Sequence, residues 1–164
     1  MSGPATIVAV EGRRMMRLAR ELPAERFDSL LSAYQRVVTA ALNQGGGRRV
    51  EVSGDSVSAG FASPREAVFA AVAVQRGLAE HEWADSLRPE ASIGIHAGEA
   101  AALRCEELCD AAEGGQTFLS PLTAGLLEGE DLGEWSLRDL GEVRTRRGGE
   151  LVRAYELVAA GVSF

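Results

Sequence analysis

The sequence lacks long apolar runs, an excess of positive charge and more than two cysteines. Its longest apolar stretches are interrupted by Arg, Gln or Glu well before the roughly 18 residues of a membrane-spanning helix, and the N-terminus has no basic segment followed by an apolar one. We therefore expect no membrane association, no export signal and a cytoplasmic location. Acidic residues outnumber basic ones by 24 to 17, giving a net charge of -7, which argues against nucleic acid as a partner.

The two cysteines, Cys105 and Cys109, are spaced i, i+4, so both thiols face the same side of a helix and form no disulfide framework. A zinc site would need further ligands, and His81 and His96 lie in other predicted elements without a recognised zinc spacing. We interpret the cysteines as small buried side chains with free thiols, as expected in a reducing compartment.

The rest of the composition is typical of one globular domain. Apolar residues make up 46% and charged residues 25% of the 164-residue chain, close to average usage. A chain of this length can bury about two-thirds of its unfolded surface in a single core. Since no repeat, low-complexity tract or linker is visible, residues 1–164 are predicted to form a single domain.

Periodicity predicts helices and strands in a mixed order. Apolar residues at helical spacing predict helices over 13–22, 24–43, 64–81 and 103–112. Alternating or β-branched runs predict strands at 6–10, 91–96, 116–119, 135–140 and 151–158, and a hairpin over 50–61 that turns at Gly54 and Asp55. Ser120 and Pro121 are expected to close the strand at 116–119. This order predicts an α/β (α+β) fold in which helices cover a mixed sheet.

Five short segments lie in an order that is informative when they are taken together. They are VEVSGDS (50–56) with FASP (61–64), PAERF (23–27), IGIHAGE (93–99), LCDAA (108–112) with GGQ (114–116), and DLGE (139–142). In order and spacing they resemble class III nucleotidyl cyclases, the adenylate and guanylate cyclase family, over nearly the whole chain. The resemblance implies a ferredoxin-like core that dimerises head to tail, with each nucleotide site built from both subunits.

The resemblance also implies two metal ions, held by two aspartates, that assist attack of a ribose 3′-hydroxyl on the α-phosphate. Asp55 matches the aspartate at the hairpin turn. The first-strand match puts Ala9 at the other position, and a methyl group cannot ligate a cation. Glu11 lies two residues further along on the same face and is the alternative ligand. We therefore interpret Asp55 either as the remnant of a Mg²⁺ or Mn²⁺ site or as a turn residue, and expect no required cofactor.

The family stabilises its transition state with an Asn and an Arg, whose positions are matched here by Leu103 and Glu107. A carboxylate in place of the Arg would repel the triphosphate, which reverses the electrostatic stabilisation that phosphoryl transfer needs. The segment between Glu99 and Leu108 is also shorter than in the family. No catalytic residue is therefore predicted.

Nucleotide binding remains open at two positions. Glu51 matches the base-selecting position of the family, where a Glu goes with guanine. A carboxylate can accept hydrogen bonds from guanine N1 and N2. It can equally be an exposed residue of an alternating strand. Arg146, together with Arg144 and Arg147, matches the region of a phosphate-contacting Lys or Arg, or forms a solvated hairpin tip. We expect His96 to have a structural role.

Together these features predict a catalytically inactive, degenerate cyclase-like domain that acts as a regulatory or protein-interaction module, with a nucleotide as a further potential ligand. We expect a homodimer or a heterodimer with a cyclase-like protein. The alternative is a cyclase subunit that forms cyclic AMP or cyclic GMP with a complementing partner and contributes Asp55 and Arg146 to the shared site. A third hypothesis is a homodimeric scaffold without any ligand.

Overall fold

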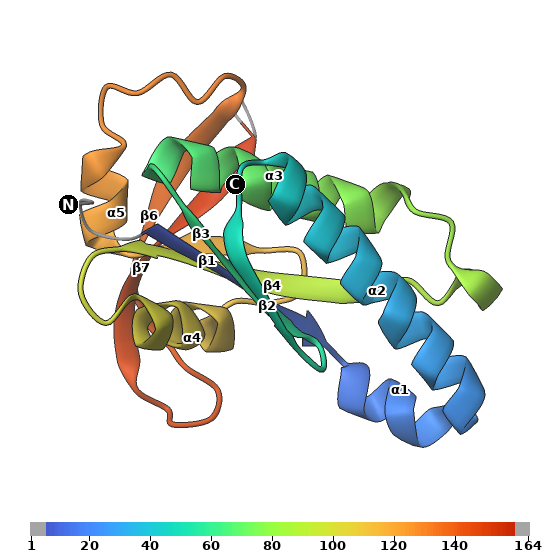
Figure 1. The fold of residues 1–164 in the computed structure, drawn as a ribbon. Coiled ribbons are helices and arrows are strands. Elements are labelled where there is room, and N and C mark those ends of the chain that lie inside the picture. The colour runs from blue at the N-terminus through green and yellow to red at the C-terminus, as the bar shows by residue number, and fades with distance from the viewer. Residues whose placement is uncertain (1–5, 160–164) are drawn as a thin grey trace.

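A seven-stranded mixed sheet forms the centre of the structure (Figure 1), a computed structural model that describes residues 6–159. The strand order is β2-β3-β1-β4-β5-β7-β6. Only β4 and β5 are parallel neighbours among the described strands, and the other adjacent pairs are antiparallel. The strands are β1 (Thr6–Arg13), β2 (Arg48–Ser53), β3 (Ser56–Phe61), β4 (Glu90–Ala97), β5 (Thr117–Leu119), β6 (Trp135–Arg144) and β7 (Leu151–Ala159).

Helices cover both faces of this sheet. The long helices α2 (Ala24–Gln44) and α3 (Pro64–Glu80) pack together on one face, and α4 (Ala101–Ala111) packs against β1 and β4 on the other (Figure 1). The short α1 (Met15–Glu21) precedes α2, and α5 (Pro121–Leu126) follows β5. Pro23 separates α1 from α2, since proline is disfavoured inside a helix.

The main hydrophobic core lies between the sheet and the α2–α3 layer. Its largest fully buried side chains include Tyr34, Leu42, Ile93, Ile95 and Leu119. In β1 burial alternates, so that Val8 and Val10 face this core while their neighbours point toward the opposite face. That opposite face of β1 is only partly covered, which leaves room for a groove.

The structure confirms the predicted order of strands and helices and moves several of their boundaries. β1 continues to Arg13, because residues 11–13 pair with β4, and the following helix begins only at Met15. β5 ends at Leu119, directly before Ser120 and Pro121 as predicted, and the Ser120 side chain also accepts a hydrogen bond from the amide of Thr123 and caps α5. This helix and a 3₁₀ turn at Ala84–Ser86 are too short to produce a recognisable periodicity.

The structure confirms that both cysteines are buried free thiols. On α4, Cys105 Sγ lies 3.3 Å from the carbonyl oxygen of Ile7, and Cys109 Sγ lies 3.2 Å from that of Ala9. Burial raises the pKa of Cys105 to about 12 and raises the pKa of Cys109 well above its usual value.

Among the helices of residues 6–159, none is long and apolar enough to cross a membrane.

These thiols are expected to resist modification in the native protein. Because only a thiolate reacts readily, Ellman's reagent should label neither cysteine at pH 8 until a denaturant unfolds the chain, after which both should react. The folded state holds the thiol protons more tightly than the unfolded chain does. Unfolding free energy should therefore decline as the pH rises above about 9 toward 12. Rapid labelling of the native protein would contradict the burial of this helix face.

Candidate functional site

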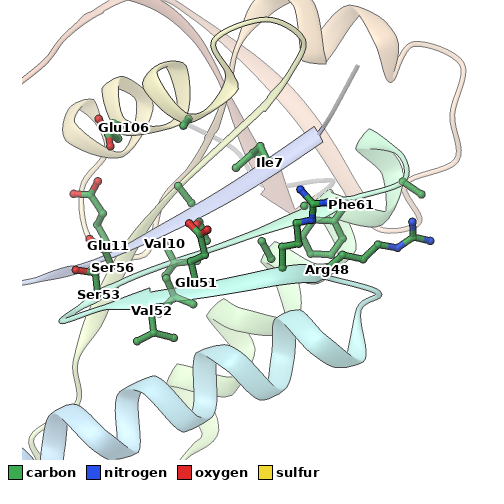
Figure 2. Close-up of a pocket in the computed structure, with 18 residues that line it drawn as sticks. Ile7, Val10, Glu11, Arg48, Glu51, Val52, Ser53, Ser56, Phe61 and Glu106 are labelled. Atoms are coloured by element: carbon green, nitrogen blue, oxygen red, sulfur yellow. The ribbon is translucent and has the colours of Figure 1, made fainter. Parts of the chain in front are cut away.

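A groove of about 1070 Å³ lies on the sheet face opposite α2 and α3 (Figure 2). β1 lines it with Ile7, Ala9 and Glu11, because alternate residues of a strand face the same side. α4 closes one wall with Glu106. β2, the edge strand, contributes Glu51 from the other side.

Strand register decides which β1 residue lies next to the hairpin turn. Ala9 pairs with Ser58, well inside β3, whereas Glu11 pairs with Ser56, the residue that follows Asp55. The amide of the next residue, Gly12, donates a 3.1 Å hydrogen bond to the carbonyl oxygen of Asp55. Gly12 therefore lies opposite Asp55, Glu11 is the groove-facing residue of β1 nearest to the turn, and Ala9 lies two residues further into the sheet.

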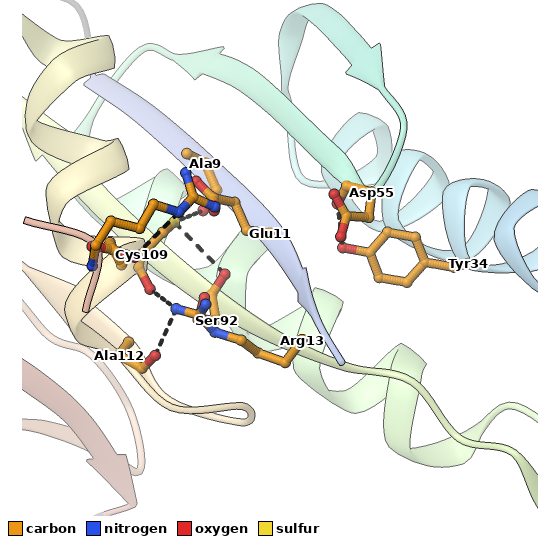
Figure 3. A network of polar contacts seen from close by, with 10 residues as sticks. Ala9, Glu11, Arg13, Tyr34, Asp55, Ser92, Cys109 and Ala112 are labelled. Atoms are coloured by element: carbon orange, nitrogen blue, oxygen red, sulfur yellow. Dashed lines mark hydrogen bonds and ion pairs between the residues drawn. The ribbon is translucent and has the colours of Figure 1, made fainter. Parts of the chain in front are cut away.

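Two side chains of α2 hydrogen-bond to the backbone of the hairpin turn at Gly54 and Asp55. The hydroxyl of the fully buried Tyr34 donates a 2.8 Å hydrogen bond to the carbonyl oxygen of Asp55 (Figure 3). Gln35 Nε2 donates one of 2.8 Å to the carbonyl oxygen of Gly54. A Cβ at Gly12 would lie 3.2 Å from Asp55 Oδ2, so the glycine leaves space for this carboxylate. The backbone thus fixes the Asp55 side chain beside the end of β1.

The carboxylates of Glu11 and Asp55 form what we call the acidic corner. The guanidinium groups of Arg13 and Arg147 lie close enough to offset its negative charge. Burial raises the pKa of Glu11, the Arg147 and Arg13 guanidinium groups lower it, and the nearby Asp55 and Asp110 carboxylates raise it further. Burial likewise raises the pKa of Asp55, and the same two arginines oppose that rise. Arg13 also donates from Nη2 to the carbonyl oxygens of Cys109 and Ala112, which ties β1 to the end of α4 (Figure 3).

Comparison with known proteins gives structural matches only. No protein-family profile and no curated protein sequence match the chain. The adenylyl cyclase CyaB from P. aeruginosa matches with a TM-score of 0.82 and 20% identity, over 98% of this chain and 96% of that chain. The guanylate cyclase domain of RhGC from Catenaria anguillulae, in complex with GTP, matches with a TM-score of 0.80 and 12% identity, over 96% and 97%.

An adenylate cyclase from Trypanosoma brucei in its monomeric state matches with a TM-score of 0.81 and 18% identity, over 98% of this chain and 91% of that chain. The chain has the fold of class III nucleotidyl cyclase catalytic domains. This confirms the fold class predicted from the sequence. At these identities, the likeness establishes the cyclase fold and no activity.

The acidic corner does not fit the two-metal centre that the cyclase fold implies. Within residues 6–159, no group of three or more His, Cys, Asp and Glu side chains is arranged to hold a metal ion. Mg²⁺ prefers an octahedral shell of oxygen atoms, whereas Glu11 and Asp55 share their surroundings with the guanidinium groups of Arg13 and Arg147. Positive side chains at this position repel a divalent cation.

The α4 positions that the cyclase resemblance assigns to transition-state stabilisation carry no suitable group. The side chain of Leu103 is largely exposed, at 57%, and offers no hydrogen bond. Glu107 accepts a 3.1 Å hydrogen bond from Nη1 of Arg104, one turn earlier in the same helix. This part of α4 therefore presents an apolar side chain and a paired carboxylate.

The two proposed nucleotide-binding residues lie in different surroundings. Glu51 lines the groove on β2 (Figure 2), but Arg146 is not among the groove residues and pairs with Glu113 at 2.5 Å. The arginine that reaches the acidic corner is Arg147, in the turn between β6 and β7. The arginines at positions 144, 146 and 147 mark this turn in the sequence. No local pattern, however, distinguishes Arg147 from Arg146.

His96 is part of a buried hydrogen-bonded chain. Its Nδ1 lies 2.5 Å from Ser120 Oγ, which lies 2.7 Å from Thr123 Oγ1, and the latter accepts a hydrogen bond from the amide of Ala97. Burial lowers the pKa of His96 and favours the neutral ring. The chain links β4 to the start of α5, in agreement with the structural role predicted for His96.

Proposed function

We propose that this chain is a catalytically inactive cyclase-fold domain that acts as a regulatory or protein-interaction module. The observation that carries the proposal is the chemistry of α4, where Leu103 is exposed and apolar and Glu107 is negative and paired with Arg104. Catalysis of phosphoryl transfer depends on positive or hydrogen-bond-donating groups aimed at the developing charge. Neither Leu103 nor Glu107 supplies such a group.

The charges along the groove support a protein partner better than a nucleoside triphosphate. Glu11 and Glu106 lie at one end and Arg48 at the other, because β2 runs antiparallel to β3 away from the Asp55 turn (Figure 2). The acidic end repels a triphosphate, whereas a groove with separated charges of both signs complements a protein surface of opposite pattern. Glu51 remains the candidate contact for a guanine base.

A second cyclase-fold domain is the partner we propose, as a homodimer or a heterodimer. The exposed apolar side chains of Leu122, Leu126 and Leu151 on α5 and β7 support an association surface, and the edge strand β2 offers a separate one at the other side of the sheet. Leu122 and Leu151 line one cavity of about 300 Å³. The guanylyl cyclase domain of the RhoGC fusion protein from Blastocladiella emersonii has been solved as a dimer and as a monomer.

The proposal is tested by assaying the purified chain for cyclic nucleotides. With ATP or GTP and either Mg²⁺ or Mn²⁺, we expect no product above that of a protein-free control, because α4 lacks stabilising groups. A catalytically complete cyclase assayed in parallel provides the positive control. Sustained formation of cyclic AMP or cyclic GMP by the chain alone would refute the inactive assignment.

A second candidate function is a subunit that completes the site of a partner cyclase. The proximity of Asp55 to Glu11 favours it, since Glu11 lines the groove and the Asp55 carboxylate acts on it. In a complex with an active cyclase domain, Asp55→Asn should abolish the partner's activity if this subunit role is correct. An unchanged turnover in the mutant complex would favour the regulatory module instead.

A further inference from the structure

A second cavity, of about 300 Å³, lies where α4, α5 and β7 come together (Figure 1). None of the described residues that line it also lines the groove. Its apolar wall is formed by Leu108, Pro121, Leu122, Leu151 and Val152. The side chains of Leu122 and Leu151 are 56% and 52% exposed, so the cavity is open to solvent. Small-molecule sites in proteins begin at about this volume, which therefore suits a small organic ligand.

The inner end of the cavity carries polar groups that are already satisfied. His96 and Ser120 line it and are both buried. Ser120 Oγ lies within hydrogen-bond distance of His96 Nδ1 and of Thr123 Oγ1. Burial lowers the pKa of His96 and Arg104 lowers it further, against the opposing effect of a hydrogen bond with the Glu99 backbone, so the ring is neutral at pH 7. An apolar group can therefore lie against this end without depriving a polar atom of its partner.

The charged residues that line the cavity give it a positive balance. They are Arg104, Arg153 and Glu107, in a chain whose net charge is -7. Each arginine side chain is 56% exposed. Arg104 pairs with Glu107 through Nη1, and Arg153 approaches Asp139 through Nη2. Because a guanidinium group has five N–H donors in a planar fork, both arginines keep donors for an external anion.

We propose that this cavity binds a small carboxylic acid with an apolar tail, a medium-chain fatty acid in its ionised form. The tail packs against Leu108, Leu122 and Leu151. The carboxylate accepts hydrogen bonds from Arg104 and Arg153 at the exposed side. The inference goes beyond the proposed function and does not depend on it, because binding here requires neither a nucleotide nor a partner domain.

The test uses octanoate as the probe and octylammonium, which has the same tail but the opposite charge, as its control. In two-dimensional NMR spectra of the full chain, octanoate should shift the amides of Leu122 and Leu151 and saturate at about 1 mM, the affinity expected of so small a ligand. The amide of Ile7 in the groove should not shift. Octylammonium should leave all three amides unchanged, because the arginines repel it.

Two matched aspartate variants locate the site. Leu122 and Leu103 are 56% and 57% exposed, and each lies in the first turn of its helix, where an acidic residue is well tolerated. Only Leu122 lines the cavity. Leu122→Asp should weaken octanoate binding about tenfold or more, through a lost apolar contact and a repelling charge, whereas Leu103→Asp should bind as the wild type does. Circular dichroism should show both variants folded.

The arginines are tested by the double variant Arg104→Gln and Arg153→Gln, in which octanoate should bind no better than uncharged octanol. Equal shifts with octylammonium and octanoate, or equal affinities of the two aspartate variants, would overturn the proposal. Absence of octanoate binding, with self-association that is lost in Leu122→Asp, would assign these leucines to a partner surface and would also overturn it. Since no nucleotide is present, each outcome is independent of cyclic nucleotide formation.

Discussion

Gly94→Ala is expected to lower the unfolding free energy by about 3 kcal/mol, near the upper end of typical overpacking effects. An added Cβ at Gly94 on β4 would lie 2.5 Å from the carbonyl oxygen of Cys105 and 2.9 Å from the Cβ of Leu108. Both neighbours belong to α4, and a backbone carbonyl cannot move aside as a flexible side chain can. The helix would have to shift away from the sheet, which would also expose the buried thiols of Cys105 and Cys109.

Gly60→Ala provides the matched control in the same sheet. A Cβ at Gly60 would have its nearest neighbours at 3.7 Å or more, which is ordinary van der Waals contact. Urea unfolding followed by circular dichroism should therefore place Gly60→Ala within about 0.5 kcal/mol of the wild type. Equal stability of the two alanine variants would contradict the close packing of α4 on β4.

Tyr34→Ala is expected to destabilise the chain by about 4 kcal/mol, since its aromatic side chain is fully buried in the main core. Tyr34→Phe keeps the ring but removes the hydrogen bond to the carbonyl oxygen of Asp55, and should cost about 1 kcal/mol. The comparison separates core packing from anchoring of the turn. Both free energies can be measured by the same urea titration.

The phenylalanine variant also tests how the candidate site is held. Loss of the Tyr34 hydroxyl should loosen the Asp55 turn, so the amide of Gly12, which donates to the carbonyl oxygen of Asp55, should exchange its hydrogen faster than in the wild type. Amides at the centre of β4, such as that of Ile95, should be unaffected. Unchanged exchange at Gly12 would show that α2 does not control the turn.

Most of the fold follows from local patterns in the sequence. The helical stripe of 24–43 and the alternation of 50–61 each predict one element, because burial on one side imposes the period of that element. α5 has only six residues and therefore shows no stripe. The capping signal at Ser120 and Pro121 was visible, but the same residues can also end a strand.

The candidate site could be predicted from the sequence only in part. Ala9 and Glu11 lie two residues apart on the same strand face, so strand alternation cannot decide which of them is next to Asp55. That decision depends on the pairing of β1 with β3, which is a tertiary property. The role of Arg147 depends on contacts with residues distant in sequence, Glu11 and Asp110, and no local motif encodes them.

We propose that this domain combines a cyclase fold with a site that does not catalyse cyclisation. The most direct test is a single-turnover assay with protein in excess over ATP or GTP, in which the wild type is compared with Glu11→Gln and Asp55→Asn under Mg²⁺ or Mn²⁺. We predict that all three proteins give the same background of cyclic nucleotide, because Glu11 and Asp55 share their surroundings with the guanidinium groups of Arg13 and Arg147, which repel a divalent cation. Product formed by the wild type and lost in both variants would contradict the account.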